Sequence, residues 1–205
     1  MSMTMSTASI EHRVVGQPVE LRAAEGAATT LGGYAAVFNR EAVIAGMFRE
    51  QIAPGAFTDA IGRDDVRALF NHDANFVLGR TVSGTLRLSE DETGLRYDVT
   101  PPSTTWAADL LASVARGDIS QSSFGFSVEV DEWTRPATRE ELPLRTIRRA
   151  TLYDVSPVTF PAYEDTTVAA RDAAAGLMPV DTEAVAHAIA CDRVRGELAI
   201  AEAMS

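Results

Sequence analysis

SQSSFGFSVEV, residues 120–130, is the stretch that decides how this chain is interpreted. Side chains alternate between the two faces of a strand, so one face of this segment is predicted to be apolar core: Phe124, Phe126, Val128 and Val130. The other face is small and polar: Ser123, Gly125, Ser127 and Glu129. Because Gly125 has no side chain, another backbone can approach closely there, which makes Ser123 a candidate nucleophile. A strand whose solvent face is simply rich in serine is the alternative interpretation.

The composition indicates an acidic globular protein. The 205 residues are 46% hydrophobic and carry a formal net charge of -11 at pH 7, which suits one domain with appendages. Nucleic acid is not an expected partner, because phosphate binding needs clustered Lys and Arg. We interpret the one basic cluster, RTIRR at 145–149, as a solvated strand face. No apolar run approaches the ~20 residues of a membrane span, so no membrane partner is expected.

The sequence predicts neither a metal site nor a cofactor. Cys191 is the only cysteine, which excludes a disulfide framework and a cysteine-based zinc site and favours a cytosolic compartment. The histidines at 12, 72 and 187 are too few and too dispersed along the chain to indicate a His-rich site, although carboxylate sites stay open. No GxGxxG, P-loop, HExxH or GxSxG pattern occurs.

The chain divides into three regions by composition. Residues 1–30 are predicted to be a mobile leader with at most one strand, around Val14 to Leu21. Residues 31–170 form the domain. Residues 171–205 are an Ala-rich linker followed by a helix that begins near Asp181.

Within 31–170 most of the predicted elements are strands. They cover residues 31–39, 66–73 and 146–163, with a hairpin of TLRLS and LRYDVT around the turn at 90–94. FTDAIGR (57–63) predicts one or two helical turns. STTWAADLLASVARGD (103–118) predicts the most regular helix, which ends at Gly117.

Three residues on these elements have the chemistry of a serine hydrolase. His72 stands at or just past the end of the strand 66–73, where a surface or capping role is the alternative. Asp154 is the only acidic residue in TIRRATLYDVSPVTFPAY, and its apolar neighbours predict a partly desolvated carboxylate with a charged or hydrogen-bonding partner. With Ser123, they could act as nucleophile, base and orienting acceptor. Spacing alone does not select them, because triads are recognised by geometry.

Several blocks of the sequence occur together in one order: GYAAVFN, IAPGAF, ALFNHD, VLGRT, GTLRLSEDETGLRY, GDISQSSFGF and LYDVSPVTFPAY. In this order they resemble the tailed-phage prohead (procapsid maturation) protease family, over roughly residues 31–170. The resemblance implies a fold similar to the herpesvirus assemblin proteases. That fold is mainly β with α (α+β), an antiparallel β-barrel surrounded by helices.

The resemblance also implies roles for the three candidates. His72 of FNHD is the general base, Ser123 directly before FGF is the nucleophile, and Asp154 of LYDVSP stands where the family often has Glu. Aspartate is one methylene shorter, so its reach to His72 is the least secure part of the triad. Ser122 stands where the family commonly has a bulkier apolar residue. Strand alternation predicts that Ser122 is buried and that Ser123 is not.

The function that the resemblance implies is a serine endopeptidase without a cofactor. Its substrates would be the major capsid protein and scaffold of a tailed phage or prophage, inside the procapsid in the host bacterial cytoplasm. Self-cleavage is expected between Val168 and Met178, and homo-oligomerisation stays open. One alternative is a non-enzymatic β-barrel module for capsid assembly or scaffolding. A second is a host or prophage peptidase with no capsid partner.

Overall fold

The computed structural model describes residues 10–22, 29–138 and 141–160. All of them belong to the first of the two units into which the chain divides, Met1–Ala169. The predicted tail at 171–205, its helix near Asp181 and the predicted self-cleavage segment lie outside the described residues. No helix in the described part is long and apolar enough to cross a membrane.

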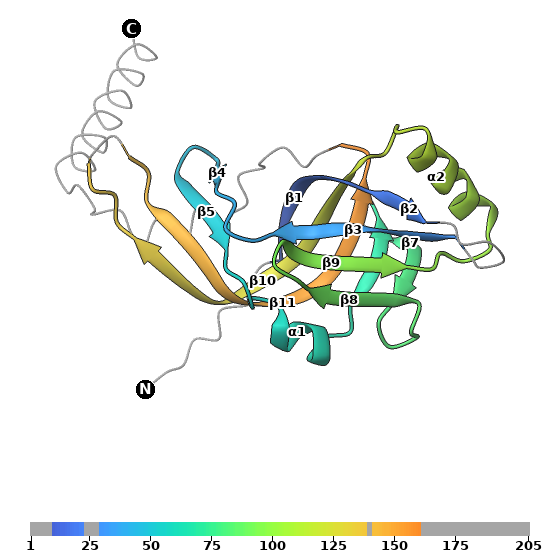
Figure 1. The fold of residues 1–205 in the computed structure, drawn as a ribbon, viewed down its shortest axis with the longest axis horizontal. Coiled ribbons are helices and arrows are strands. Elements are labelled where there is room, and N and C mark those ends of the chain that lie inside the picture. The colour runs from blue at the N-terminus through green and yellow to red at the C-terminus, as the bar shows by residue number, and fades with distance from the viewer. Residues whose placement is uncertain (1–9, 23–28, 139–140, 161–205) are drawn as a thin grey trace, which may run out of the picture. The chain divides into compact units, whose positions relative to one another are not determined.

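The described residues form eleven strands and two helices (Figure 1). In chain order they are β1 (Glu11–Pro18), β2 (Glu20–Arg22), β3 (Thr30–Val37), β4 (Ala42–Ile44), β5 (Phe48–Ile52), α1 (Thr58–Arg63), β6 (Arg67–Phe70), β7 (Asp73–Arg80), β8 (Leu86–Glu90), β9 (Gly94–Val99), α2 (Thr105–Ala115), β10 (Gln121–Thr134) and β11 (Leu144–Val158). The predicted β8–β9 hairpin and the two helices predicted within residues 31–170 are confirmed. Gly117 follows α2 with a φ of 82°, a left-handed conformation that glycine adopts without strain.

The strands form two sheets. The larger has the order β1-β10-β11-β5-β4, with β6 pairing β11 and β7 pairing β6, and the smaller has the order β2-β3-β9-β8. The prediction of a mainly β chain with α is confirmed. A closed barrel surrounded by helices is not: the described strands stay in two separate sheets and the described helices number only two.

The larger sheet is also mixed rather than antiparallel. β11 pairs antiparallel with β10 but parallel with both β5 and β6. Its length of 15 residues lets its two ends pair with different strands. Its start lies beside β5 through residues 144–147, and its later part lies beside β6 at Asp154 and Val155.

The N-terminal region holds more regular structure than expected. Two strands, β1 and β2, occur where at most one was predicted. β1 pairs antiparallel with β10, so that His12 lies opposite Gly125 and Val14 opposite Ser123. Val15 is buried in the core, and this burial stabilises the strand. The part of the predicted leader from Glu11 to Arg22 is therefore paired strand.

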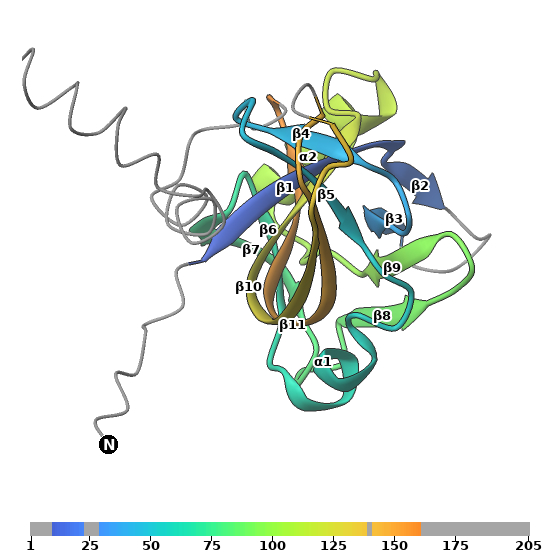
Figure 2. The same ribbon diagram turned by 90° about the vertical axis from the view of Figure 1, so that its left-hand side faces the viewer.

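One apolar core contains residues of both sheets, among them Leu31 and Tyr97 of the smaller sheet and Phe124 and Phe126 of β10. Burial of each phenylalanine contributes about 1.5–3 kcal/mol. The predicted core face of β10 is confirmed at these two residues but wrong at Val130, which is 38% exposed. Bulges between Gly125 and Phe126 and after Val128 disturb the alternation of faces. Figure 2 shows β10 and β11 running side by side through this hairpin.

The basic cluster RTIRR is a solvated face only in part. Arg148 and Arg149 are exposed, as predicted, but Arg145 is buried. Its guanidinium nitrogens lie 2.8 Å from Asp131 Oδ2, 3.1 Å from Glu50 Oε2 and 3.4 Å from Glu11 Oε1. A buried charge needs such partners to offset its desolvation, and none of them is near Arg145 in the sequence.

Candidate active site

His72 lies in the two-residue turn that joins β6 to β7. Phe70 pairs with Asp73 across this turn, and Asn71 and His72 have φ angles of 54° and 58°. A type I′ hairpin turn requires positive φ at both central residues, and Asn and His are among the non-glycine residues that adopt it most readily. The turn therefore holds His72 just past the end of a strand, as predicted.

Asn71 fastens this turn to the end of β11. Its amide nitrogen Nδ2 donates to Thr159 Oγ1 at 3.1 Å, and its Oδ1 accepts from the backbone N–H of Thr159 at 2.8 Å. Its own backbone N–H donates to the carbonyl of Pro157 at 3.1 Å. Because β11 also carries Asp154, the turn and the carboxylate are held in a fixed relation.

The structure brings the three predicted residues together. His72 Nε2 lies 2.7 Å from Ser123 Oγ, and His72 Nδ1 lies 2.6 Å from Asp154 Oδ1. In the tautomer that carries the proton on Nδ1, the imidazole donates to Asp154 and accepts from the Ser123 hydroxyl. The shorter side chain of aspartate therefore reaches His72.

Gly125 makes room for this carboxylate. It lies opposite Asp154 in the β10–β11 pair, and a Cβ built on it would collide with Asp154 Oδ2 and come within 3.2 Å of His12 Nε2. The predicted close approach at Gly125 thus occurs, but the approaching group is a side chain rather than a backbone. Any larger residue at this position would displace Asp154.

Two further polar residues in this cluster were missed by sequence reasoning. Ser156 is buried, and its hydroxyl donates to Asp154 Oδ1 at 2.6 Å. Its position two residues beyond Asp154, on the same strand face, was an available signal. His12 lies with its ring centroid 4.1 Å from that of His72. Nothing local indicates this contact, because it depends on the pairing of β1 with β10.

The electrostatics of the cluster follow from burial. Asp154 is only 7% exposed and has hydrogen-bonding partners, as predicted from its apolar neighbours. Burial lowers the pKa of His12 below its usual value, and the nearby His72 lowers it further, while Asp154 acts in the opposite direction. His12 is therefore neutral at neutral pH.

The adjacent serines have different partners. The Ser122 hydroxyl lies 2.8 Å from the Tyr97 hydroxyl inside the core, where burial raises the pKa of Tyr97 far above its usual value. Ser123 faces His72 on the other side of β10, as alternation predicts. The expectation that Ser123 is exposed is wrong, because its exposed fraction is 0%. β10 lies between β1 and β11, and the His72 ring contacts the hydroxyl.

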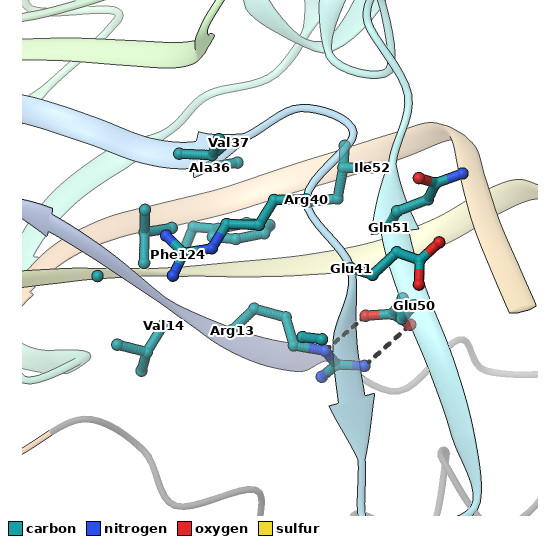
Figure 3. Close-up of a pocket in the computed structure, with 13 residues that line it drawn as sticks. Arg13, Val14, Ala36, Val37, Arg40, Glu41, Glu50, Gln51, Ile52 and Phe124 are labelled. Atoms are coloured by element: carbon teal, nitrogen blue, oxygen red, sulfur yellow. Dashed lines mark hydrogen bonds and ion pairs between the residues drawn. The ribbon is translucent and has the colours of Figure 1, made fainter. Parts of the chain in front are cut away.

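Two cavities in the described part of the chain are lined by residues other than Ser123. The first, of about 210 Å³, is lined by residues that include Arg13, Arg40, Glu50 and Phe124; Figure 3 shows the Arg13–Glu50 ion pair at its wall. Phe124, and not Ser123, is the β10 residue that lines it. The second, of about 260 Å³, is mainly apolar and lies between α2 and the β6–β7 hairpin: Phe70, Phe76, Trp106, Asp109, Leu110, Ser113 and Ile119.

Metal binding is a second chemistry open to part of this cluster. His12, His72 and Asp154 each present a donor atom, and these atoms lie within 4.8 Å of one another. Two of the three histidines, which are far apart in the sequence, are therefore neighbours in the fold. Both ring nitrogens of His72 are nevertheless engaged by Asp154 and Ser123.

A hydroxyl, an imidazole and a carboxylate linked in this order form the arrangement that serine hydrolases use. The chain belongs to the caudovirus prohead serine protease family, whose sequence model matches residues 17–179. The family predicted from the sequence blocks is thereby confirmed.

A similar curated protein is the prohead protease of Enterobacteria phage HK97. It is 34% identical over 151 residues, which cover 71% of this chain and 61% of that protein. The chain thus spans about three fifths of the length of this relative. Among solved structures, the chain is similar to the capsid assembly protease of bacteriophage T4. That similarity has a TM-score of 0.49 and 11% sequence identity, over 76% of this chain and 100% of the other.

Proposed function

We propose that this chain is a serine endopeptidase that cleaves capsid and scaffold proteins during procapsid maturation. The observation that carries the proposal is the unbroken chain of hydrogen bonds from Ser123 through His72 to Asp154, in a member of the prohead serine protease family. The name of its HK97 relative supports the same substrate class. The protease would act inside the procapsid in the host cytoplasm and would detach its own tail (171–205) by cleavage between Val168 and Met178.

The proposed reaction is acyl transfer. Ser123 Oγ attacks the peptide carbonyl while His72 Nε2 accepts its proton, and the protonated imidazole then donates that proton to the leaving amine. Water deprotonated by the same imidazole releases the acyl group from Ser123. Asp154 accepts from Nδ1–H and stabilises the positive charge that forms on His72.

Ser156 supports the carboxylate in this scheme. Its hydroxyl donates to the same Asp154 oxygen that His72 contacts, which restrains the position of the carboxylate. Because Ser123 is completely buried, a substrate cannot reach its hydroxyl in this conformation. A substrate carbonyl can reach Oγ only after a neighbouring side chain shifts.

Covalent labelling tests the proposal without a known cleavage sequence. A fluorophosphonate probe reacts with an activated serine: the Oγ–phosphorus bond forms, the phosphorus–fluorine bond breaks, fluoride leaves, and the proton passes to His72. We expect mass spectrometry of the full-length chain to find the label on Ser123 and on no other serine. Ser123→Ala should stay unlabelled.

Co-expression with the capsid gene of the same genome tests the substrate class. We expect the wild type to convert the capsid protein to a shorter product and Ser123→Ala to leave it intact. A chain that neither reacts with the probe nor cleaves the capsid protein would instead be the non-enzymatic assembly module.

A further inference from the structure

His12 is a second imidazole in direct contact with His72. The ring centroids are 4.1 Å apart and the ring planes are tilted by 55°. The Nε2 atom of His12 lies 4.0 Å from Asp154 Oδ2, which is too long for a hydrogen bond. The ring contact, rather than a polar bond, is therefore its main interaction with the site.

The strand that carries His12 is firmly held. On either side of His12, Glu11 and Arg13 point the other way, and Arg13 Nε donates to Glu50 Oε1 at 2.7 Å. The pairing with β10 places His12 opposite Gly125, where the missing side chain leaves space for the imidazole. The position of the His12 ring is thus set by backbone register and by a buried ion pair.

The two hydrogen bonds of His72 leave its ring free to rotate about the line through Nδ1 and Nε2. Its two hydrogen bonds, to Asp154 and Ser123, are made by the ring nitrogens and so lie near the plane of the imidazole. Two in-plane bonds resist sliding of the ring but resist its rotation about the Nδ1–Nε2 direction only weakly. A group packed against the face of the ring resists that rotation.

We propose that His12 is a positioning residue that holds the face of the His72 ring, so that β1 is a functional part of the active site. This inference rests on the proposed function. The charged or titratable groups that influence His12 are His72 and Asp154 on its own side of β1 and Arg13 on the opposite side. Because His12 contacts His72 through its ring and its Nε2 lies too far from Asp154 for a hydrogen bond, it acts as a flat ring, and another flat ring can replace it.

Labelling kinetics on the full-length chain separate positioning from probe binding. We expect His12→Ala to lower the maximum rate of fluorophosphonate labelling at Ser123 by about 10- to 100-fold, the cost of a misplaced catalytic group. The probe concentration for half-maximal rate should stay within about twofold. His12→Phe should restore the rate to within about threefold of the wild type.

Two more variants complete the test. His12→Leu fills similar space without a flat ring and should be slow like His12→Ala, which keeps the comparison with His12→Phe informative if the alanine variant folds poorly. Gln17→Ala, on the same strand but outside the cluster, should match the wild type. A thermal melt of each variant checks that it is folded.

The outcomes are distinct. Equal or faster labelling of His12→Ala, or a His12→Phe variant as slow as His12→Ala, overturns the inference while the proposed function stands. A wild type that is not labelled at Ser123 overturns the proposed function, and this inference with it.

Discussion

Two polar clusters, each with buried residues at its centre, lie on opposite sides of β1 and use its alternate residues. The triad cluster consists of His12, His72, Ser123, Asp154 and Ser156. The ion-pair cluster consists of Glu11, Arg13, Glu50, Asp131 and Arg145. In the ion-pair cluster every guanidinium contacts at least two carboxylates, whereas the hydrogen-bonding partners of Asp154 are an imidazole and a hydroxyl.

The difference decides what each cluster can do. Burial opposes the charge of Arg13, but Glu50 and Glu11 outweigh it and raise the pKa of Arg13, so its proton is fixed. His72 lies instead between a carboxylate that stabilises its charged form and a hydroxyl that can release a proton to it. The ion-pair cluster therefore holds strands together, and the triad cluster can move a proton.

Loss of the Ser123 hydroxyl should have the largest effect on activity. We expect Ser123→Ala to abolish probe labelling and capsid cleavage, a loss on the order of 10⁴-fold or more, with little change in the melting temperature. Ser122→Ala is the matched control, because its hydroxyl bonds to Tyr97 in the core, and it should stay active. Reversed results for the two serines would mean that the register of β10 is wrong by one residue.

Asp154→Asn should come next. The amide keeps the shape of the side chain but can favour the wrong tautomer of His72, and we expect a loss of labelling rate of up to on the order of 10⁴-fold, by analogy with other triads. The rate is measured with the probe at saturation, and folding by circular dichroism. A variant that labels within about threefold of the wild type would remove Asp154 from the mechanism.

The ion-pair cluster should respond in stability instead. Arg145→Ala leaves the carboxylates of Glu11 and Glu50 buried with fewer partners, which should cost about 3–5 kcal/mol of unfolding free energy. Urea denaturation measures this. Arg148→Ala removes an exposed pair with Glu132 and should cost less than about 1 kcal/mol. Equal costs for the two would contradict the structural role assigned to Arg145.

A smaller effect should appear on acidification. The pKa of His12 is lower in the folded protein than its ordinary 6.5, so between these values the unfolded chain binds more protons and stability falls as the pH falls below about 6.5. His12→Phe removes the titrating imidazole and with it this pH-dependent loss of stability. Its unfolding free energy should therefore improve relative to the wild type between pH 7.5 and pH 5. A constant difference over that range would mean that folding does not shift this pKa.

The smallest effect should come from a chelator. If the cluster works as a triad, treatment of the purified chain with EDTA should change the labelling rate at Ser123 by less than about twofold. Added zinc measures whether the donor atoms of His12, His72 and Asp154 can also bind metal. A large loss of labelling on chelation, restored by metal, would favour a metal-dependent site.

The sequence predicts the parts of this fold whose signals are local. The β8–β9 hairpin and α2 are specified by turn residues and periodicity, and Gly117 marks the end of α2. His72, Ser123 and Asp154 were selected as candidates through blocks that resemble a family, and alternation correctly placed Ser122 and Ser123 on opposite faces of the strand. Each of these inferences needs only neighbouring residues or a known pattern.

What the sequence did not predict depends on pairing between distant segments. The burial of Ser123, the contact of His12 and the partners of Arg145 all require knowledge of which strands flank β10 and β11. Alternation says which face a side chain occupies, but it does not say what covers that face. The parallel pairing of β11 with two different strands is of the same kind.

The order of the strands also sets when the proposed enzyme can become active during synthesis. β1, which carries His12, pairs with β10. About a hundred residues separate the two strands, so β1 stays unpaired for roughly 5–20 s at a synthesis rate of about 5–20 residues per second. Asp154 follows later still, on the last described strand. A ribosome-bound chain therefore carries an incomplete triad until β11 has emerged, so the proposed cleavage cannot begin before that point.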